Sequence, residues 1–192
     1  MPTPVTQGPD PLARDVNSPR AACLAAARVA EVNHGLPEGL LTAIALNESG
    51  LHAYALNLRG RAYFPNSREE AQRLLAAARG RGMAGCFQIN AGVHAARGED
   101  WPLDPSQAAD WAARYLVQHY ETYGDWGRAV LRWHGASPRR AGTQIICRLH
   151  SKLEVTAPGS DLFADRCRPG APQWARVRRN GATLLEVAEA SE

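Results

Sequence analysis

The sequence predicts a mainly α-helical protein. Helix start and stop signals recur over residues 18–154 of the 192-residue chain, and only short links separate the expected helices. Apolar residues in these segments recur at helical spacing and make up 45% of the chain, which is enough for a packed core. We therefore expect a disordered segment over residues 1–17, one helical domain over residues 18–154 and a tail over residues 155–192.

The first helix is expected to begin at Ser18 and Pro19, because serine suits the N-cap and proline suits the first helical position. It should end near Gly35. A second helix over residues 40–49 follows, and its leucine and isoleucine residues lie on one stripe, which indicates burial. Gly50 suits the left-handed conformation that ends many helices.

Glu48 lies in the last turn of this second helix. The helix dipole disfavours a negative charge there, and burial would also favour the protonated form. A carboxylic acid that stays protonated near neutral pH can serve as a general acid. The alternative is a solvated glutamate that ends a core helix.

The next segments alternate between loops and helices. Partial alternation around Gly60 predicts a short hairpin or ordered loop over residues 51–66, and Ser67 opens a capping box before a helix that runs to Arg79. Further helices are expected over residues 104–124, 126–134 and 137–153, each preceded or opened by a capping residue.

The tail is expected to contain a β-hairpin. Residues 174–179 and 182–187 flank Asn180-Gly181, a pair that favours tight two-residue turns. Because an isolated hairpin is only marginally stable, it should pack on the domain or on a partner.

Composition excludes several classes of function. The net charge is +3 and the arginines are scattered, so nucleic-acid binding is not indicated. No stretch of 18 apolar residues exists, so no membrane-spanning helix is expected. The first 18 residues lack the basic start and apolar segment of a signal peptide.

The four cysteines leave the redox state open. They form no CxxC pair and have no histidine at zinc-ligand spacing, so no metal site is expected. An even count permits two disulfides in an oxidising compartment, in any of three connectivities, and four thiols are the alternative. The cysteines are Cys23, Cys86, Cys147 and Cys167.

Three short segments occur in a meaningful order: Glu48-Ser49-Gly50, then Gly-Cys-Phe-Gln-Ile-Asn over residues 85–90, then Ala-Val-Leu-Arg-Trp-His-Gly-Ala over residues 129–136. An alanine-rich helix over residues 108–116 lies between the last two. Together they resemble the soluble lytic transglycosylase family of lysozyme-like enzymes over about residues 20–137. The resemblance implies a lysozyme-like helical fold and cleavage of peptidoglycan glycan strands without a cofactor.

The resemblance also implies a mechanism. Glu48 would protonate the oxygen that links N-acetylmuramic acid to N-acetylglucosamine. As a carboxylate it would then take the proton from the muramic C6 hydroxyl, which attacks C1 and leaves a 1,6-anhydro sugar. Ordinary glycosidases need a second carboxylate. The only acids between Ser49 and Asn90 are Glu69 and Glu70, on a helix that we expect to be exposed.

The family's site residues carry over with one departure. Trp133-His134 stands where the family usually has Tyr-Asn, and tryptophan can donate but not accept a hydrogen bond. Tyr115, Tyr120 or His134 is left to take the tyrosine's role, and Cys86 and Phe87 are interpreted as apolar lining of the cleft. The substrate-binding residues implied are Ser49, Phe87, Gln88, Asn90, Tyr115, Trp133 and His134, with Glu48 as the catalytic residue.

The implied compartment is the periplasm or cell envelope. Some members of the family serve a flagellum or a secretion or conjugation apparatus, so the tail is a candidate segment for docking such a partner. Two alternatives stay open at this point. One is a muramidase that adds water, and the other is an inactive peptidoglycan-binding or assembly module, which the departure at Trp133 makes worth testing.

Overall fold

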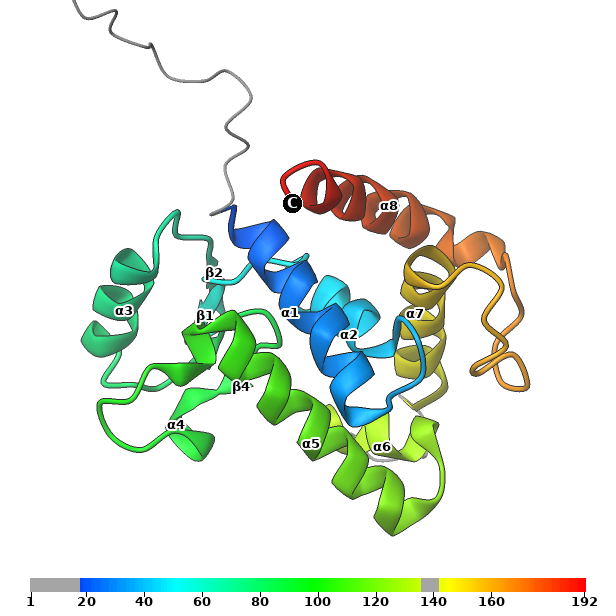
Figure 1. The fold of residues 1–192 in the computed structure, drawn as a ribbon, viewed down its shortest axis with the longest axis horizontal. Coiled ribbons are helices and arrows are strands. Elements are labelled where there is room, and N and C mark those ends of the chain that lie inside the picture. The colour runs from blue at the N-terminus through cyan, green and yellow to red at the C-terminus, as the bar shows by residue number, and fades with distance from the viewer. Residues whose placement is uncertain (1–17, 136–141) are drawn as a thin grey trace, which may run out of the picture.

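The computed structural model describes residues 18–135 and 142–192, and it is mainly helical (Figure 1). Its helices are α1 Pro19–His34, α2 Leu40–Ser49, α3 Arg68–Ala77, α4 Ala91–His94, α5 Pro105–Tyr123, α6 Trp126–Trp133, α7 Gly142–Thr156 and α8 Ala175–Glu189. Its strands are β1 Leu56–Leu58, β2 Arg61–Tyr63, β3 Met83–Ala84 and β4 Ile89–Asn90, and the short 3-10 helices are η1 Trp101–Leu103 and η2 Pro172–Trp174.

The predicted helix starts are confirmed by side-chain caps. In each case a serine or aspartate side chain accepts a hydrogen bond from a backbone N–H in the first turn, which satisfies a group that the helix itself leaves unpaired. The capping residues are Ser18, Ser67, Asp104 and Asp125. The expected disorder over residues 1–17 and the expected helix start at Ser137 lie outside the described residues.

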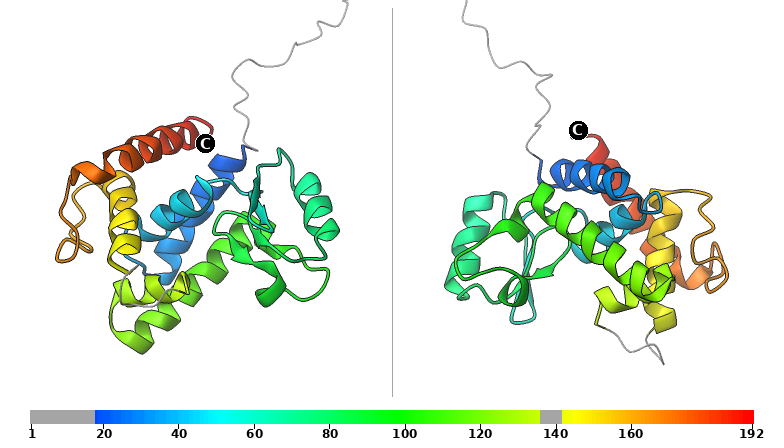
Figure 2. Two further views of the ribbon diagram at one scale, coloured as in Figure 1. Left: turned by 180° about the vertical axis from the view of Figure 1, so that it is seen from behind. Right: turned by 60° about the horizontal axis from the view of Figure 1, so that its bottom comes forward.

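Helix α2 forms the centre of the main core. Every residue from Leu40 to Leu46 is buried, so the helix is enclosed on all sides and not only along the predicted stripe. It packs against α1, α5, α7 and α8 (Figure 2). The buried carboxylate of Glu31 on α1 accepts hydrogen bonds from the N–H groups of Gly39 and Thr42, at 3.1 and 2.7 Å, and so caps the N-terminus of α2.

The four strands form a small antiparallel sheet in the order β2-β1-β3-β4 beside α3. The predicted hairpin is confirmed: Leu56 pairs with Tyr63 and Leu58 with Arg61 across the turn at Arg59-Gly60. Both turn residues have positive φ, 53° and 83°, as a two-residue hairpin turn requires. This sheet and α3 enclose a second apolar core, so the segment from β1 to η1 forms a lobe of its own.

The predicted hairpin in the tail is wrong, because residues 175–189 form helix α8. Asn180-Gly181 lies inside this helix, which packs against α7, α1 and α2. A Cβ on Gly181 would lie 3.2 Å from the Lys152 side chain and 3.3 Å from that of Leu46, so glycine allows the close approach. The Lys152 ammonium donates to the Val177 carbonyl oxygen at 3.2 Å. Tertiary packing therefore overrides the local turn signal.

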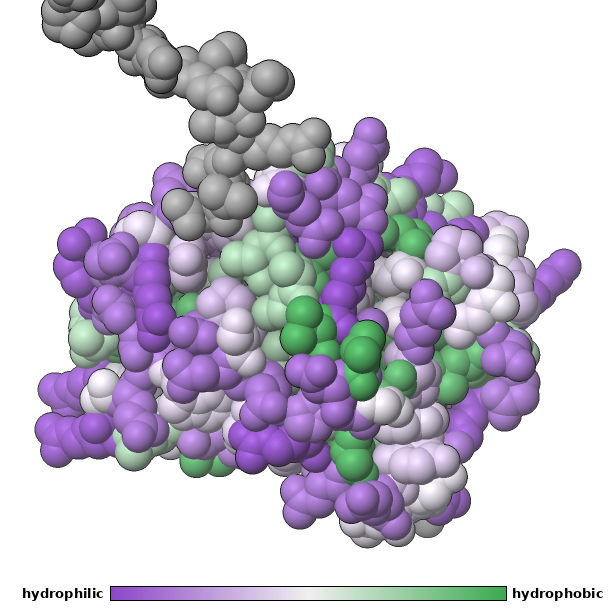
Figure 3. Space-filling model, viewed as in Figure 1, coloured by the Kyte–Doolittle hydropathy of each residue, from purple (hydrophilic) through white to green (hydrophobic). Residues whose placement is uncertain are grey.

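Two disulfides select one of the three possible connectivities. Cys23–Cys86 ties α1 to the loop between β3 and β4, and Cys147–Cys167 ties α7 to the segment before α8. Among the described residues, no helix is both long and apolar enough to cross a membrane. The face shown in Figure 3 is mostly polar, with a few apolar side chains near its centre, and Val29 and Val32 of α1 are exposed.

Candidate active site

Glu48 is a largely buried carboxyl group near the C-terminal end of α2. Its side chain is 18% exposed. Burial raises the pKa of Glu48 from its ordinary value of 4.5 to about 7, and a hydrogen bond from the Asn47 amide and the positive charge of Arg148 lower it by less. Glu48 is therefore part protonated and part ionised near neutral pH, which is the condition that acid–base catalysis needs.

Side chains from three helices surround this carboxyl group. The Nε2 atom of His134, which follows α6, lies 3.4 Å from Glu48 Oε1. Asn47 donates to the same oxygen at 3.4 Å, and Arg148 of α7 donates from Nε to Asn47 Oδ1 at 3.1 Å. Burial lowers the pKa of His134, so its imidazole is neutral at pH 7 and can donate one hydrogen bond. Sequence reasoning missed Asn47 and Arg148: Asn47 directly precedes Glu48, but only the packing of α7 on α2 brings Arg148 to this pair.

Ser49 joins the end of α2 to the loop between β3 and β4. Its buried hydroxyl donates to the Cys86 carbonyl oxygen at 2.7 Å and lies 3.2 Å from the Ala45 carbonyl oxygen. It also accepts from the His52 backbone N–H at 2.9 Å. These contacts fix the helix end that carries Glu48, and no hydrogen bond joins Ser49 to the Glu48 carboxyl within the described structure.

Hydrogen bonds hold the loop from Gly85 to Gln88 against the end of α2 and the neighbouring segments. Gln88 has a positive φ of 48°, and its side-chain amide donates to the carbonyl oxygens of Ala55 and Gly85, both at 3.1 Å. Gly85 has φ +78°, and a Cβ there would lie 1.9 Å from the Pro102 carbonyl oxygen. Gln88 thus supports the loop through its amide nitrogen, which leaves its carbonyl oxygen for other donors.

The prediction that Cys86 and Phe87 line the cleft is wrong. Both side chains are fully buried in the main core, and Cys86 is bonded to Cys23. A motif position identifies the segment but not the direction of a side chain, and here the two apolar residues anchor the loop from beneath. Asn90 is exposed at the start of α4, where its side chain makes no capping hydrogen bond.

Half-buried aromatic side chains follow one face of α5 and meet α6. Tyr115 stacks on Trp111 at 4.9 Å between ring centroids, and Trp133 packs edge-on against Tyr115 at 5.7 Å. Trp133 directly precedes His134, so this cluster adjoins the Glu48 site. Tyr120 instead stacks on Trp126 at 4.2 Å. Sequence reasoning missed Trp111 as a neighbour of the site.

The charged and polar groups that act on Glu48 indicate a single carboxyl group at the site. The groups that act on the pKa of Glu48 include no carboxylate from the described part of the chain. Within the same residues, no cluster of three histidine, cysteine, aspartate or glutamate side chains is arranged to hold a metal ion. The arrangement offers one carboxyl group that exchanges a proton near pH 7, with hydrogen-bond donors that stabilise its ionised form.

The structure combines a mainly helical domain with one buried carboxyl group beside half-buried aromatic rings, an arrangement that suits acid–base cleavage of a glycan. The sequence model of the transglycosylase SLT domain family matches residues 25–136, which is more than half of the chain. The protein belongs to this family, and membership supports a peptidoglycan-cleaving function of the lytic transglycosylase type. No curated protein and no solved structure matches the chain. Helix α8 lies outside the matched residues.

Proposed function

We propose that the protein is a lytic transglycosylase that cleaves the β-1,4 bond from N-acetylmuramic acid to N-acetylglucosamine. The Glu48 carboxyl donates its proton to the bridging oxygen as the bond from that oxygen to C1 of the muramic sugar breaks. The Glu48 carboxylate then accepts the proton of the muramic C6 hydroxyl, whose oxygen bonds to C1. The products are a 1,6-anhydro end and a free N-acetylglucosamine end, and no water is consumed.

The observation that carries this proposal is that burial, Asn47 and Arg148 act on the pKa of Glu48 within the described structure, with no carboxylate among the groups that do so. Hydrolytic glycosidases place a second carboxyl group within about 5–10 Å of the acid, where it acts as nucleophile or activates water. No carboxylate of the described residues contributes to the pKa of Glu48. An internal hydroxyl of the substrate removes the need for that second group, since Glu48 alone can serve as acid and then as base.

The neighbours of Glu48 suit both protonation states. When Glu48 has lost its proton, the Asn47 amide and the Arg148 charge stabilise the anion. Neutral His134 lies 3.4 Å from the carboxyl oxygen and limits the directions in which the carboxyl group can turn. We assign His134 a positioning role, together with Asn47, in place of the Tyr-Asn pair that is usual in the family.

The substrate surface proposed beside Glu48 combines aromatic and amide groups. The rings of Trp111, Tyr115 and Trp133 are half-buried, so each leaves part of a face or edge for the apolar side of a sugar ring. The free carbonyl oxygen of Gln88 and the exposed amide of Asn90 suit sugar hydroxyl and acetamido groups. Ser49 acts indirectly, through the position of the helix end.

The decisive experiment compares the wild type with Glu48→Gln on purified sacculi, with mass analysis of the released fragments. We expect anhydro-muropeptides from the wild type and none from the variant. Glu38→Gln is the matched control, because Glu38 is exposed at the opposite end of α2. Fragments with reducing ends would identify a muramidase instead. Equal release by wild type and Glu48→Gln would end the assignment of Glu48, and binding of sacculi without release by either would favour an assembly module.

The proposed compartment is the cell envelope. Two disulfides persist in oxidising compartments and are rare in reducing ones, so their pairing supports exposure to the periplasm or an equivalent space. The docking of the tail to a flagellar or secretion-machine protein stays a prediction. One face of α8 is already used in contacts with α1, α2 and α7, which leaves the opposite face for a partner.

A further inference from the structure

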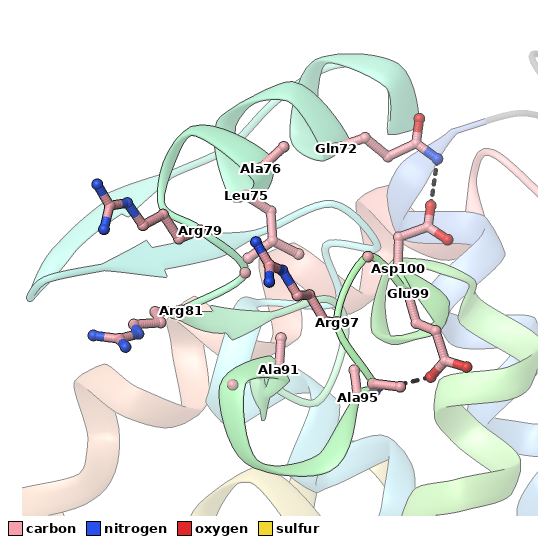
Figure 4. A pocket seen from close by; sticks show the side chains of 14 residues that line it. Gln72, Leu75, Ala76, Arg79, Arg81, Ala91, Ala95, Arg97, Glu99 and Asp100 are labelled. Carbon is pink, nitrogen blue, oxygen red and sulfur yellow. Dashed lines mark hydrogen bonds between the residues drawn. The ribbon is translucent and has the colours of Figure 1, made fainter.

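A pocket lies in the lobe from β1 to η1, and its lining does not include Glu48. Its volume is about 940 Å³, and it is bounded by α3, α4 and the segment that leads to η1 (Figure 4). Three arginines line it: Arg79 and Arg81 from the turn after α3, and Arg97 from the segment after α4. Apart from residues 85–90, this lobe has no role in the proposed catalytic site.

The three guanidinium groups carry positive charge that the described structure does not neutralise. None of them forms a salt bridge with any acid in the described ranges, whereas Asp100 is paired with Arg68 at 3.3 Å. A hydrogen bond from Gln72, together with Arg68, holds the pKa of Asp100 below its usual range. Figure 4 shows Arg79 and Arg81 on one side of the pocket, with Arg97 between them and the acidic side.

The acidic side of the pocket is occupied by the protein's own contacts. The Glu99 carboxylate accepts from the Ala96 backbone N–H at 3.0 Å, and Asp100 accepts from the Gln72 side chain. Both acids line the pocket, but each already has a donor. A ligand that enters therefore meets Arg97, with Arg79 and Arg81 at the edge of the pocket, and the forked donors of a guanidinium group suit carboxylates and phosphates.

The pocket is built on a fixed backbone and small side chains. The Gly80 N–H donates to the Leu75 carbonyl oxygen at 2.9 Å, and the Ala91 N–H donates to the Gly82 carbonyl oxygen at 2.9 Å. These bonds hold the turn after α3 against the start of α4. Alanine and glycine dominate the rest of the lining, so an extended chain can approach the backbone closely.

A two-stranded ribbon joins this pocket to the catalytic site. Strands β3 and β4 run from Gly82 and Ala91 at the pocket to the loop at Cys86, whose carbonyl oxygen accepts from Ser49 next to Glu48. Strand β3 has two residues, and the four steps along the chain from Gly82 to Cys86 span at most about 13 Å at 3.3 Å per residue. A peptide of three or four residues in extended form covers the same distance.

We propose that the arginine pocket, formed by Arg79, Arg81 and Arg97, binds the carboxylates of the peptide stems of peptidoglycan. The inference rests on the proposed function, because the stems leave the glycan at the muramic residue on which Glu48 would act. Each stem is a short chain with several free carboxylates, so its charge complements the pocket and its length matches the ribbon. The pocket thereby selects strands whose peptides are intact.

The test uses the full chain with Glu48→Gln, so that no turnover disturbs binding. A free stem peptide is titrated against this protein and against versions that also carry Arg97→Ala or the pair Arg79→Ala and Arg81→Ala. We expect the affinity to fall about threefold to tenfold for each guanidinium removed, and to fall with added salt, since these groups are exposed. Arg73→Ala is the matched control on α3, because Arg73 is exposed and does not line the pocket; it should change the affinity less than twofold.

Two further probes identify the source of the anion. A stem peptide with amidated carboxylates should bind all versions equally and weakly, and inorganic phosphate should compete poorly. Equal affinity of the stem peptide for the Arg97→Ala protein and its parent would overturn the proposal, and so would phosphate that displaces the peptide at equal concentration. Binding is measured without turnover. A failure of the wild type to form anhydro ends would therefore contradict the proposed reaction, and the binding measurement would still test the arginine pocket.

Discussion

Replacing Glu48 by glutamine removes a carboxyl group whose pKa is raised by burial, while keeping the size of the side chain. The side chain is 18% exposed, so water screens its charge only in part. We expect the free energy of unfolding of the wild type to fall, relative to that of Glu48→Gln, as pH rises. The physical reason is that the folded protein holds the proton of Glu48 more tightly than the unfolded chain does.

The size of this effect follows from the two pKa values. The ordinary value is 4.5, and the value in the folded protein is about 7. Each pH unit between them is worth about 1.4 kcal/mol, so ionisation of Glu48 costs the folded state about 3 kcal/mol. A raised pKa means that stability is fully present below pH 4.5 and is lost as pH rises to about 7. Above that value the difference between the two proteins should stay constant.

The assay is urea unfolding of wild type and Glu48→Gln at several pH values from 4 to 8.5, with both disulfides intact. Taking the difference between the two proteins cancels the titration of all other groups, including His52, whose pKa is lowered to about 4 by burial. Glu38→Gln is the control, and because Glu38 is exposed its curve should follow that of the wild type. The reasoning would be refuted if the stability of the wild type, relative to that of Glu48→Gln, changed by less than about 0.5 kcal/mol over this range or rose with pH. Turnover on sacculi should fall as pH rises through about 7, since the folded protein loses the proton of Glu48 there.

Three further predictions concern groups around the site. His134→Ala should lower turnover about tenfold, with little change in sacculus binding, because His134 orients the carboxyl group. The pH at which turnover falls by half on the alkaline side should not change, because His134 is itself neutral there. An unchanged turnover would contradict that role. Cys147→Ser together with Cys167→Ser should lower the free energy of unfolding by about 3 kcal/mol, measured in urea without reductant, since the bond closes a loop between positions 20 apart. Gly85→Ala should cost about 3 kcal/mol or more in the same assay, because φ is +78° and a Cβ would lie 1.9 Å from the Pro102 carbonyl oxygen; normal stability would show that the loop shifts freely.

Much of the helical framework follows from local signals. Ser18, Ser67, Asp104 and Asp125 are capping residues in the sequence and in the structure, because a cap depends only on the residues of one turn. The hairpin around Gly60 is predictable for the same reason. The structure of the tail is not predictable in this way. Asn180-Gly181 favours a turn, but the contacts of α8 with three other helices stabilise a helix there instead.

The candidate site is predictable only in part. Glu48 is predicted from the ordered set of motifs together with its place at the end of an apolar helix, and His134 from its place in a motif. Asn47 and Arg148 carry no such signal, because their contact depends on how α7 lies against α2. For Phe87 the motif predicts the position of the loop but not the direction of the side chain. Only the packed core shows that the ring points inward.

Helix α8, which the family match does not include, bears on the Glu48 carboxyl through α7. Arg148 reaches the Glu48 site from α7, and α7 is held in place from the far side by α8. Lys152 extends from α7 to the Val177 carbonyl oxygen, and Gly181 allows α8 to approach both Lys152 and α2. The tail therefore supports the site mechanically. A partner that displaced α8 would loosen the helix that carries Arg148, and so would act on the charge balance of Glu48 without touching the substrate.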